Sequence, residues 1–112
     1  MKNAPEKEIA YYQTEDGKIP FEKWLEALRD RRAMLEVEKR LLRLSMGNLG
    51  DHRTVGSGVT ELRIRYGPGY RVYLGQHGGA LVVLLCGGDK GSQDKDIEKA
   101  HAYWADWKRR SK

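Results

Sequence analysis

The 112-residue sequence predicts an α+β protein in which helices pack on an antiparallel β-sheet, with the element order β-α-α-β-β-β-α. Two observations support this fold class. Apolar residues recur at helical spacing between residues 20 and 46 and again from residue 94, whereas they alternate with polar residues from residue 59 onward. Turn-forming glycines separate these segments and no repeat or linker divides them, so one domain is expected over residues 1–112.

The first half of the chain predicts one strand and two helices. Residues 8–14 are rich in β-forming side chains and end at a Glu-Asp-Gly-Lys turn. Pro20 suits the first turn of a helix, and Asp30 is placed to cap a second helix that ends at residues 47–48. The expected inner stripes are Phe21, Trp24, Leu25 and Leu28 on the first helix, and Met34, Val37, Leu41 and Leu44 on the second. The basic residues expected to lie mostly away from the second stripe are Arg32, Lys39, Arg40 and Arg43.

The stretch RIRYGPGYRVY, residues 63–73, predicts a β-hairpin that turns at its Gly-Pro-Gly segment. In the expected register the apolar side chains meet on the buried face, so that Leu62 pairs with Leu74 and Ile64 pairs with Val72. A shift of one residue would place arginines against the core, and the alternation therefore determines which face is buried.

This register has an electrostatic consequence on the other, exposed face of the hairpin. It pairs Arg65 directly with Arg71 and places Arg63 opposite Tyr73. Like charges in such a position are destabilising by up to ~1 kcal/mol. Either the guanidinium groups spread into water or stack on Tyr73, or they form a site for an anion such as phosphate, which arginine binds with two parallel hydrogen bonds.

The last two predicted elements are a central strand and a C-terminal helix. Residues 80–86 form an almost unbroken apolar run, which is typical of a strand covered on both faces and makes Cys86 a buried, unreactive thiol. Asp94 is placed to cap a helix that ends in a frayed basic tail at residues 108–112. The expected inner stripe of this helix comprises Ile97, Ala100, Trp104 and Trp107.

Positive charge is concentrated in the second half of the chain. Of the net charge of +5, residues 61–112 carry +4, from 10 Lys and Arg against 6 Asp and Glu, and no acid lies between Leu62 and Gly88. Lys90 follows the central strand and is expected beside the hairpin arginines. Tyrosines alternate with these cations, a combination that suits single-stranded nucleic acid. These features indicate a basic surface for RNA or for an acidic partner.

Several other classes of protein are not favoured. No apolar run is long enough to span a membrane, and the N-terminal residues lack the apolar segment of a secretory signal, so no membrane partner and a cytoplasmic location are expected. The three histidines and the single cysteine lack the spacing of a metal site, and no cofactor is expected.

Six segments, spread over most of the chain, match the motifs of a known family in the same order. The chain resembles the RelE/ParE toxins of bacterial toxin-antitoxin systems, and specifically the HigB-like addiction module killer proteins. The segments are DGK (16–18), PFEKWL (20–25), GNLGD (47–51), GVTELRI (58–64), GPGYRVY (67–73) and GGDKGSQDKDI (87–97).

The resemblance implies a small RelE-like fold and a type II toxin whose partner is a cognate helix-turn-helix antitoxin. RelE and HigB relatives are metal-independent endoribonucleases that cut mRNA, commonly in the ribosomal A site, and so inhibit translation. ParE relatives instead inhibit DNA gyrase by binding it, so the shared fold does not decide the target. The expected function is an mRNA interferase, with a gyrase inhibitor and a non-toxic remnant that only binds an antitoxin as alternatives.

The resemblance also assigns the site. The sheet arginine of the family falls on Arg71, the basic residues of the preceding strand fall on Arg63 and Arg65, and the cation after the last strand falls on Lys90. The expected catalytic residues are therefore Arg71, Lys90, Arg65 and Tyr73, and the expected RNA-binding residues are Arg63, Tyr70, Gln93 and Lys95. Relatives place a tyrosine or histidine where this chain has Gln93, Asp94 and Asp96, so the general acid is not assigned.

In the expected mechanism, Arg71 and Arg65 clamp the scissile phosphate. Lys90 supplies charge or carries a proton, and Tyr73 or Tyr70 stacks on a base or donates a proton.

Overall fold

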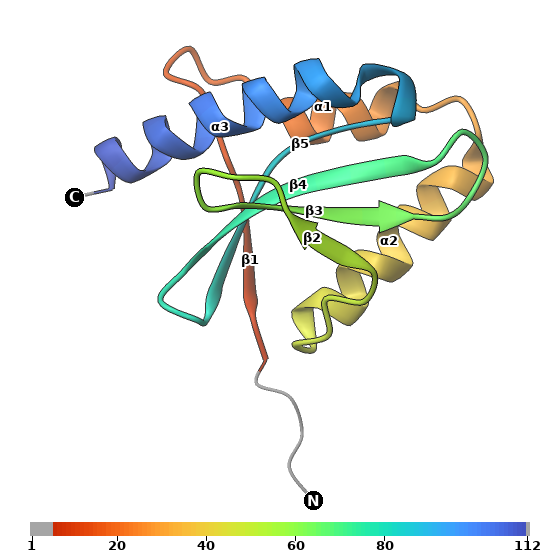
Figure 1. Cartoon of the computed structure of the whole chain (residues 1–112), viewed down its shortest axis with the longest axis horizontal. Helices are drawn as coiled ribbons and strands as arrows, with labels where there is room; N and C mark the ends of the chain where they lie inside the picture. Colours follow the sequence, from red (N-terminus) through yellow and green to blue (C-terminus); the bar gives the residue numbers. More distant parts are fainter. Residues whose placement is uncertain (1–5, 112) are drawn as a thin grey trace, which may run out of the picture.

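Five strands and three helices form an α+β fold in the computed structural model, which describes residues 6–111 (Figure 1). The predicted α+β class is confirmed. The elements are β1 (Glu8–Tyr11), α1 (Pro20–Ala27), α2 (Arg31–Ser45), β2 (His52–Thr54), β3 (Val59–Ile64), β4 (Tyr70–His77), β5 (Leu81–Gly88), the short 3₁₀ helix η1 (Lys90–Ser92) and α3 (Gln93–Arg110).

The sheet is mixed, with the strand order β1-β5-β4-β3-β2. The expected all-antiparallel sheet is wrong for one pair, because β1 runs parallel to β5. Parallel neighbours require a long connection between them, and here the two helices and three strands between β1 and β5 provide it. The additional strand β2 was also missed, because its three residues are all exposed and show no apolar alternation.

The hairpin of β3 and β4 has the predicted faces but a different register. Leu62 pairs with Val72, and Arg63 pairs directly with Arg71, so the expected partners are displaced by two residues. A shift of two residues leaves every side chain on its original face, and the apolar pattern therefore cannot distinguish the two registers. The turn decides between them: residues 65–69 form it, and the amide of Gly69 donates to the carbonyl of Tyr66.

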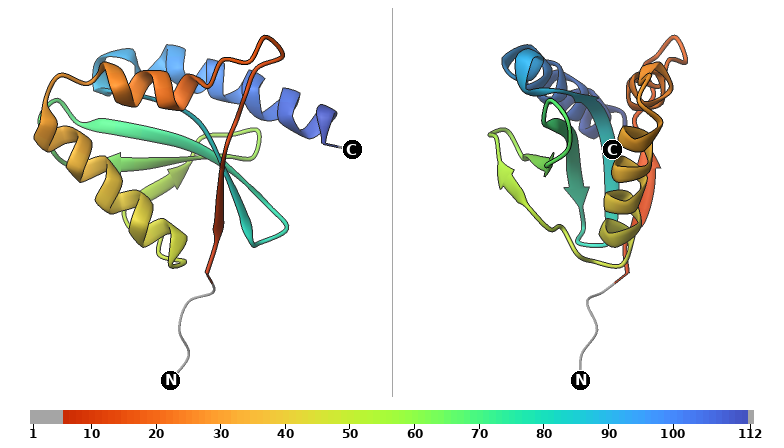
Figure 2. Two further views of the ribbon diagram at one scale, coloured as in Figure 1. Left: turned by 180° about the vertical axis from the view of Figure 1, so that it is seen from behind. Right: turned by 90° about the vertical axis from the view of Figure 1, so that its right-hand side faces the viewer.

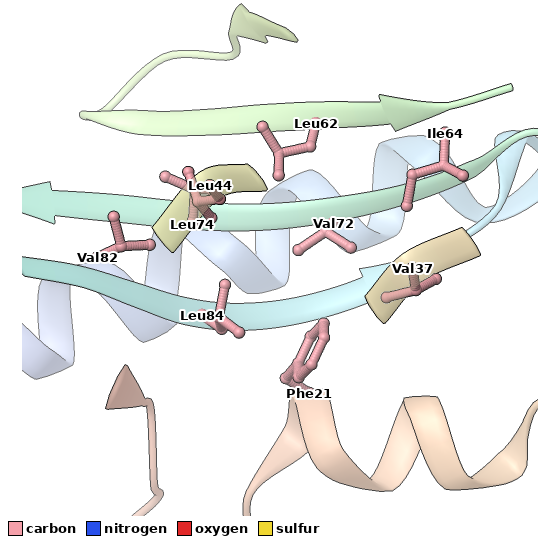
Figure 3. Packing of buried hydrophobic residues seen from close by; sticks show 9 residues of the cluster. All are labelled: Phe21, Val37, Leu44, Leu62, Ile64, Val72, Leu74, Val82 and Leu84. Atoms are coloured by element: carbon pink, nitrogen blue, oxygen red, sulfur yellow. The ribbon is translucent and has the colours of Figure 1, made fainter. Parts of the chain in front are cut away.

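Helices α1 and α2 cover one face of the sheet, and α3 covers the other (Figure 2). The core under α1 and α2 contains the predicted apolar stripes of the first helix and the hairpin, and those of the second helix except Met34, which is not part of the core (Figure 3). Its fully or nearly buried residues are Phe21, Val37, Leu44, Leu62, Ile64, Val72, Leu74, Val82 and Leu84.

The second core lies between the sheet and α3, on the face that the sequence predicts to be exposed in the hairpin. That prediction is wrong for both strands, because Tyr73 of β4 is fully buried in the core that contains Trp104, and Glu61 of β3 is fully buried on the same face. Val83 and Leu85 of β5 also belong to this core, which confirms that β5 is covered on both faces. Cys86 is buried as expected, and burial raises the pKa of its thiol to about 12.

The predicted outward position of Arg40 on α2 is also wrong. The sequence places it away from the inner stripe of α2, whereas it is 6% exposed. Its guanidinium donates to the backbone carbonyls of Leu49 at 2.7 Å, Asp51 at 3.1 Å and Arg63. These three backbone acceptors compensate the burial of the charged guanidinium. The periodicity of α2 cannot reveal this, because the acceptors belong to other segments.

The N-terminal cap is the predicted residue in α2 but a different residue at the start of α3. Asp30 accepts from the amides of Arg32 at 2.9 Å and Ala33 at 3.3 Å, which confirms the cap of α2. Asp94 is not the cap of α3. Asp89 instead accepts from the amides of Gly91 and Ser92, and this η1 turn leads into α3. The helix then continues to Arg110, so the predicted frayed tail is helical over residues 108–110, and residue 112 lies outside the described residues.

Close packing of α3 on β4 gives a first prediction. A Cβ atom at Gly75 would lie 2.4 Å from the ring of Trp104, a distance that real contacts do not show. We expect Gly75→Ala to lower the free energy of unfolding by about 1–3 kcal/mol, because the second core must rearrange. Urea unfolding measures this. Gln76→Ala, at the exposed neighbouring position, is the control, with a change within about 0.5 kcal/mol. Equal stability of the two variants would contradict the prediction.

Candidate functional site

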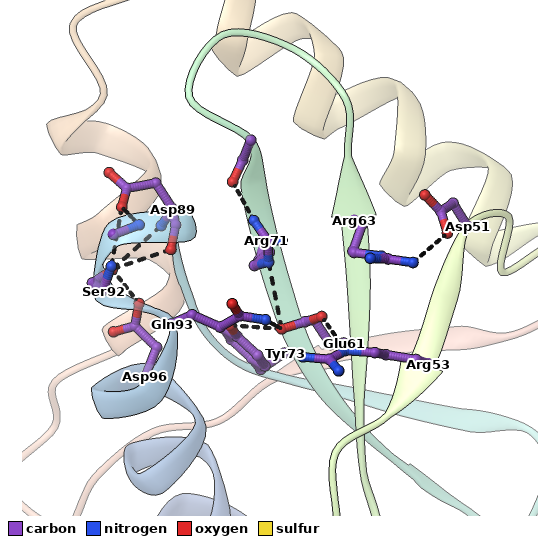
Figure 4. A network of polar contacts seen from close by, with 12 residues as sticks. Asp51, Arg53, Glu61, Arg63, Arg71, Tyr73, Asp89, Ser92, Gln93 and Asp96 are labelled. Atoms are coloured by element: carbon purple, nitrogen blue, oxygen red, sulfur yellow. Dashed lines mark hydrogen bonds and ion pairs between the residues drawn. The ribbon is translucent and has the colours of Figure 1, made fainter.

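The predicted polar residues of β3 and β4 meet beside the first turn of α3, where the edge strand β2 bends toward the face that α3 covers (Figures 2 and 4). Glu61 of β3 lies at the centre of this site and is completely buried. Its carboxylate accepts from Arg53 of β2 at 2.8 Å, from the hydroxyl of Tyr73 of β4 at 3.0 Å, and from Gln93 of α3 at 3.0 Å. A single carboxylate therefore connects three other elements.

The electrostatics of this group follow from its partners. Burial by itself raises the pKa of Glu61, but the hydrogen bonds from Arg53, Gln93 and Tyr73 outweigh burial, so its pKa lies below the ordinary value. Burial and the neighbouring carboxylate raise the pKa of Tyr73 far above that of a free phenol. Glu61 is therefore charged at neutral pH, and Tyr73 acts as a hydrogen-bond donor to it.

Arg71 is nearly buried, and one of its N–H donors has no hydrogen-bond acceptor. Its side chain is 10% exposed, and its Nη1 donates to the carbonyl of Gly69 at 2.8 Å. Its Nε lies 3.6 Å from the Glu61 carboxylate, which is an ion pair but too long for a hydrogen bond, and it has no other partner among the described residues. A buried donor without an acceptor is unfavourable and uncommon.

Arg63 is the direct cross-strand partner of Arg71, and it also has an N–H donor without an acceptor. Its Nε is buried without a hydrogen-bond partner, and its Nη2 lies 3.6 Å from Asp51. The two arginines are thus paired across β3 and β4, but their guanidinium groups turn to different partners, Arg63 to Asp51 and Arg71 to Glu61 and the Gly69 carbonyl (Figure 4). Each retains an N–H donor without an acceptor, for which an oxyanion would be a suitable partner.

Asp51 balances the outer part of the arginine cluster. Arg65 donates to it at 3.0 Å, and Arg63 forms the longer ion pair. The hydrogen bond from Arg65 is the main cause that holds the pKa of Asp51 below its ordinary value. The side chain of Arg65 is 83% exposed, so it is free to change partner. The repulsion expected inside residues 63–73 is therefore relieved by two acids outside that stretch, Glu61 and Asp51.

Lys90 lies close to the hairpin turn. A Cβ atom at Gly69 would be 3.9 Å from the Cβ of Lys90, which brings this lysine next to the residue that accepts from Arg71. A hollow of about 420 Å³ is lined by Lys90, Gln93, Lys95 and the neighbouring residues 91, 92 and 94. The three predicted residues of this segment therefore share one surface.

The loop that carries Lys90 is fixed by its own hydrogen bonds. Ser92 donates from Oγ to Asp96 at 2.5 Å, and its amide donates to Asp89 at 3.2 Å. Asp96 is 8% exposed and lies under the loop. This network positions η1 and the first turn of α3 relative to β5.

The structure thus brings together most of the residues that the sequence indicates. Arg71, Arg63, Tyr73 and Gln93 form the centre, with Arg65, Lys90 and Lys95 around it. Tyr70 lies apart: it faces the first core, where its ring contacts Trp24 with centroids 6.3 Å apart.

The sequence interpretation missed Glu61, Arg53 and Asp51 as parts of the site. Glu61 could have been found as an acid directly before the arginines of an alternating strand. The exposed strand that carries Arg53 has no comparable signal.

A second and larger groove, of about 580 Å³, lies between α1 and α3 beside the end of β5. Trp24, Tyr103 and Cys86 provide its apolar lining, and Lys23 and Lys99 also line it. It contains none of the predicted site residues.

Within residues 6–111, no group of three or more His, Cys, Asp or Glu side chains could hold a metal ion. None of the helices described there is both long and apolar enough to cross a bilayer.

Comparison with known proteins identifies a relative. An uncharacterized protein of Haemophilus influenzae is 51% identical over 82 residues, which are 73% of this chain and 83% of the relative. This chain belongs to the same family as that protein. No protein-family model matches the chain.

The buried carboxylate gives a second prediction. Because the pKa of Glu61 is lower in the folded protein, its charge stabilises the fold above the ordinary pKa of about 4.3, and this stabilisation is lost as the pH falls through the lower folded value. We expect Glu61→Gln to lower the free energy of unfolding at neutral pH by about 3 kcal/mol.

Urea unfolding of both proteins between neutral and acidic pH measures this effect. The difference in the free energy of unfolding between wild type and Glu61→Gln should be constant near neutral pH and should shrink below pH ~4.3. Glu38→Gln, an equal change of charge at an exposed position of α2, is the control and should show no such difference. A difference that persists unchanged into acid would show that the charge of Glu61 is not responsible.

Proposed function

We propose that this protein is the toxin of a type II toxin-antitoxin system, a HigB-like member of the RelE/ParE superfamily that cleaves mRNA. The proposal includes a RelE-like arrangement of the sheet and helices. It rests on the motifs in the sequence and on the chemistry of the arginine site. The observation that carries it is the cross-strand pair Arg63 and Arg71, each of which has a buried Nε without a hydrogen-bond acceptor.

This pair supports phosphate binding more than binding of an uncharged group. The guanidinium fork matches two oxygens of a phosphate, and a charge-assisted hydrogen bond is stronger than a neutral one. Glu61 is the nearest carboxylate to Arg71, and it already accepts from three other side chains. A phosphate that reaches the two guanidinium groups would therefore supply acceptors that Glu61 does not.

Cleavage of RNA at such a site would proceed by attack of the 2′-hydroxyl on the adjacent phosphorus, with loss of the hydroxyl proton to water, departure of the 5′-oxygen and formation of a 2′,3′-cyclic phosphate. In this proposal Arg71 and Arg63 hold the non-bridging oxygens and stabilise the additional charge of the pentavalent state. Arg63 takes the position first expected for Arg65, because Arg63 is the residue paired with Arg71. Lys90 adds positive charge and donates the proton that the leaving 5′-oxygen requires.

Tyr73 has a positioning role in this mechanism. Its ring is buried and its hydroxyl donates to Glu61, so it acts on the phosphate only by fixing the carboxylate that orients Arg71. Gln93 acts in the same way from α3. The site lacks a strong acid or base at the surface, which fits a ribonuclease whose substrate is positioned by the ribosome. The partner in this proposal is a helix-turn-helix antitoxin encoded in an adjacent gene.

Induction in growing cells tests the proposal. We expect the wild-type chain to arrest growth and to produce new 5′ ends in translated mRNA, detected by primer extension. Arg71→Ala should reduce cleavage by about 10²–10³-fold, because it removes a buried donor to the transition state. Arg109→Ala changes an exposed arginine at the far end of α3 and should remain as toxic as wild type.

The outcome also separates the alternative functions. Cleavage that persists in Arg71→Ala would contradict the assigned role of this residue. Growth arrest with intact transcripts and an induced DNA-damage response would indicate a gyrase inhibitor. Absence of any arrest by the wild-type chain would indicate a non-toxic binding protein.

A further inference from the structure

A third hollow, of about 270 Å³, lies between α2 and β3 next to the arginine pair. We call it the α2–β3 hollow. Its lining consists of Glu36, Arg40, Arg43, Gly50, Asp51, Arg63, Ile64 and Arg65. Glu36, Arg40 and Arg43 are spaced at i, i+4 and i+7 on α2, so this helix directs one side toward the end of β3. Arg63 belongs both to this hollow and to the pair with Arg71.

The charges around the α2–β3 hollow do not balance. Four arginines line it against two carboxylates, and both carboxylates already have cationic partners. Glu36 pairs at 3.2 Å with Arg32 and with Lys39, neither of which lines the hollow. Asp51 is shared between Arg63 and Arg65. The hollow therefore has an excess of positive charge.

Arg43 is the cation with the least compensation. It is exposed, and none of the ion pairs among residues 6–111 includes it. Its positive charge also acts on the neighbouring buried Arg40. The pKa of the Arg40 guanidinium is lowered first by burial and then by the charge of Arg43. Arg40 itself is occupied by three backbone carbonyls, so Arg43 is free to bind an external anion.

We propose that the α2–β3 hollow binds a backbone phosphate of single-stranded RNA that flanks the scissile phosphate at Arg71. This inference rests on the proposed function. Arg63 and Arg65 both pair with Asp51 and both line the hollow, so their side chains lie on the same side of the chain. A strand of RNA that leaves Arg71 can therefore follow Arg63 and Arg65 to Arg43 on α2. An acidic protein segment would be attracted by the same charge, but continuity with the Arg71 site favours the nucleic acid.

Salt-dependent binding of a non-cleavable RNA tests this inference without any cleavage. The probe is a fluorescent single-stranded RNA of roughly 12 nucleotides, a length within the usual range of such sites, with a 2′-O-methyl group on every nucleotide. Methylation removes the nucleophile but keeps the phosphates. Fluorescence anisotropy gives the Kd at salt concentrations between ~50 and ~200 mM.

We expect Arg43→Gln to weaken binding at low salt and to reduce the slope of log Kd against log salt by about 0.7, the value for one phosphate contact with a single strand. Arg65→Gln should act in the same direction. Arg109→Gln removes an arginine in the last turn of α3, which does not line the hollow. It is the matched control, and its slope should be unchanged. Arg43→Lys keeps the charge and should restore the slope.

The inference would be overturned if Arg43→Gln and Arg109→Gln had the same affinity and slope. If Arg71→Ala also abolished cleavage in cells, the hollow alone would be wrongly assigned and the proposed function would stand. Failure of the wild-type chain to bind the RNA would overturn the inference, and the cleavage assay in cells would still decide the proposed function. Arg43-dependent binding of polyglutamate, without binding of RNA, would show that the hollow takes an acidic protein segment instead.

Discussion

The buried carboxylate of Glu61 is the interaction on which the arrangement of the site depends. A charge without any exposure to water is strongly unfavourable unless hydrogen-bonded cations and donors surround it. Arg53, Tyr73 and Gln93 meet this requirement from β2, β4 and α3. The same requirement therefore fixes the edge strand, the central hairpin and the first turn of the last helix relative to one another.

Tyr73 links this polar network to the apolar packing on the same face of the sheet. Its ring lies in the core with Trp104 and Val83, while its hydroxyl reaches Glu61. A buried tyrosine commonly combines an apolar body with one satisfied hydroxyl group. Close contact of Trp104 with the backbone at Gly75 seats α3 on β4. Core packing and site geometry are thus set by the same few contacts, and a disturbance of either would affect the other.

The arginines differ in burial and in the number of their contacts, and this difference suits the proposed function. Arg71 is nearly buried and oriented by Glu61 and the Gly69 carbonyl, whereas Arg65 is largely exposed and held by Asp51 alone. A phosphate that reacts must be held in one geometry, whereas flanking phosphates only need attraction. A rigid cation beside mobile cations would meet both needs. Incomplete neutralisation by two carboxylates leaves the positive field that attracts such a chain.

The sequence by itself determined the α+β class, the helices with most of their inner stripes and the apolar face of the hairpin. These features depend on periods of 3.6 and 2 residues, which are local properties of the chain. It also indicated Arg63, Arg71, Gln93 and Lys90 as neighbours, because β5 lies beside the hairpin and leads directly into η1 and α3, which carry Lys90 and Gln93.

Only the tertiary structure decided the features that depend on distant partners. The parallel pairing of β1 with β5 depends on how the chain crosses the sheet, and the pairing of Arg63 with Arg71 depends on the turn, since a shift of two residues preserves both faces. Burial of Arg40 and Glu61 likewise depends on acceptors and donors from other elements. A sequence pattern shows which side of an element is apolar, but a buried charge is stabilised by its partners, and these meet only when the chain has folded.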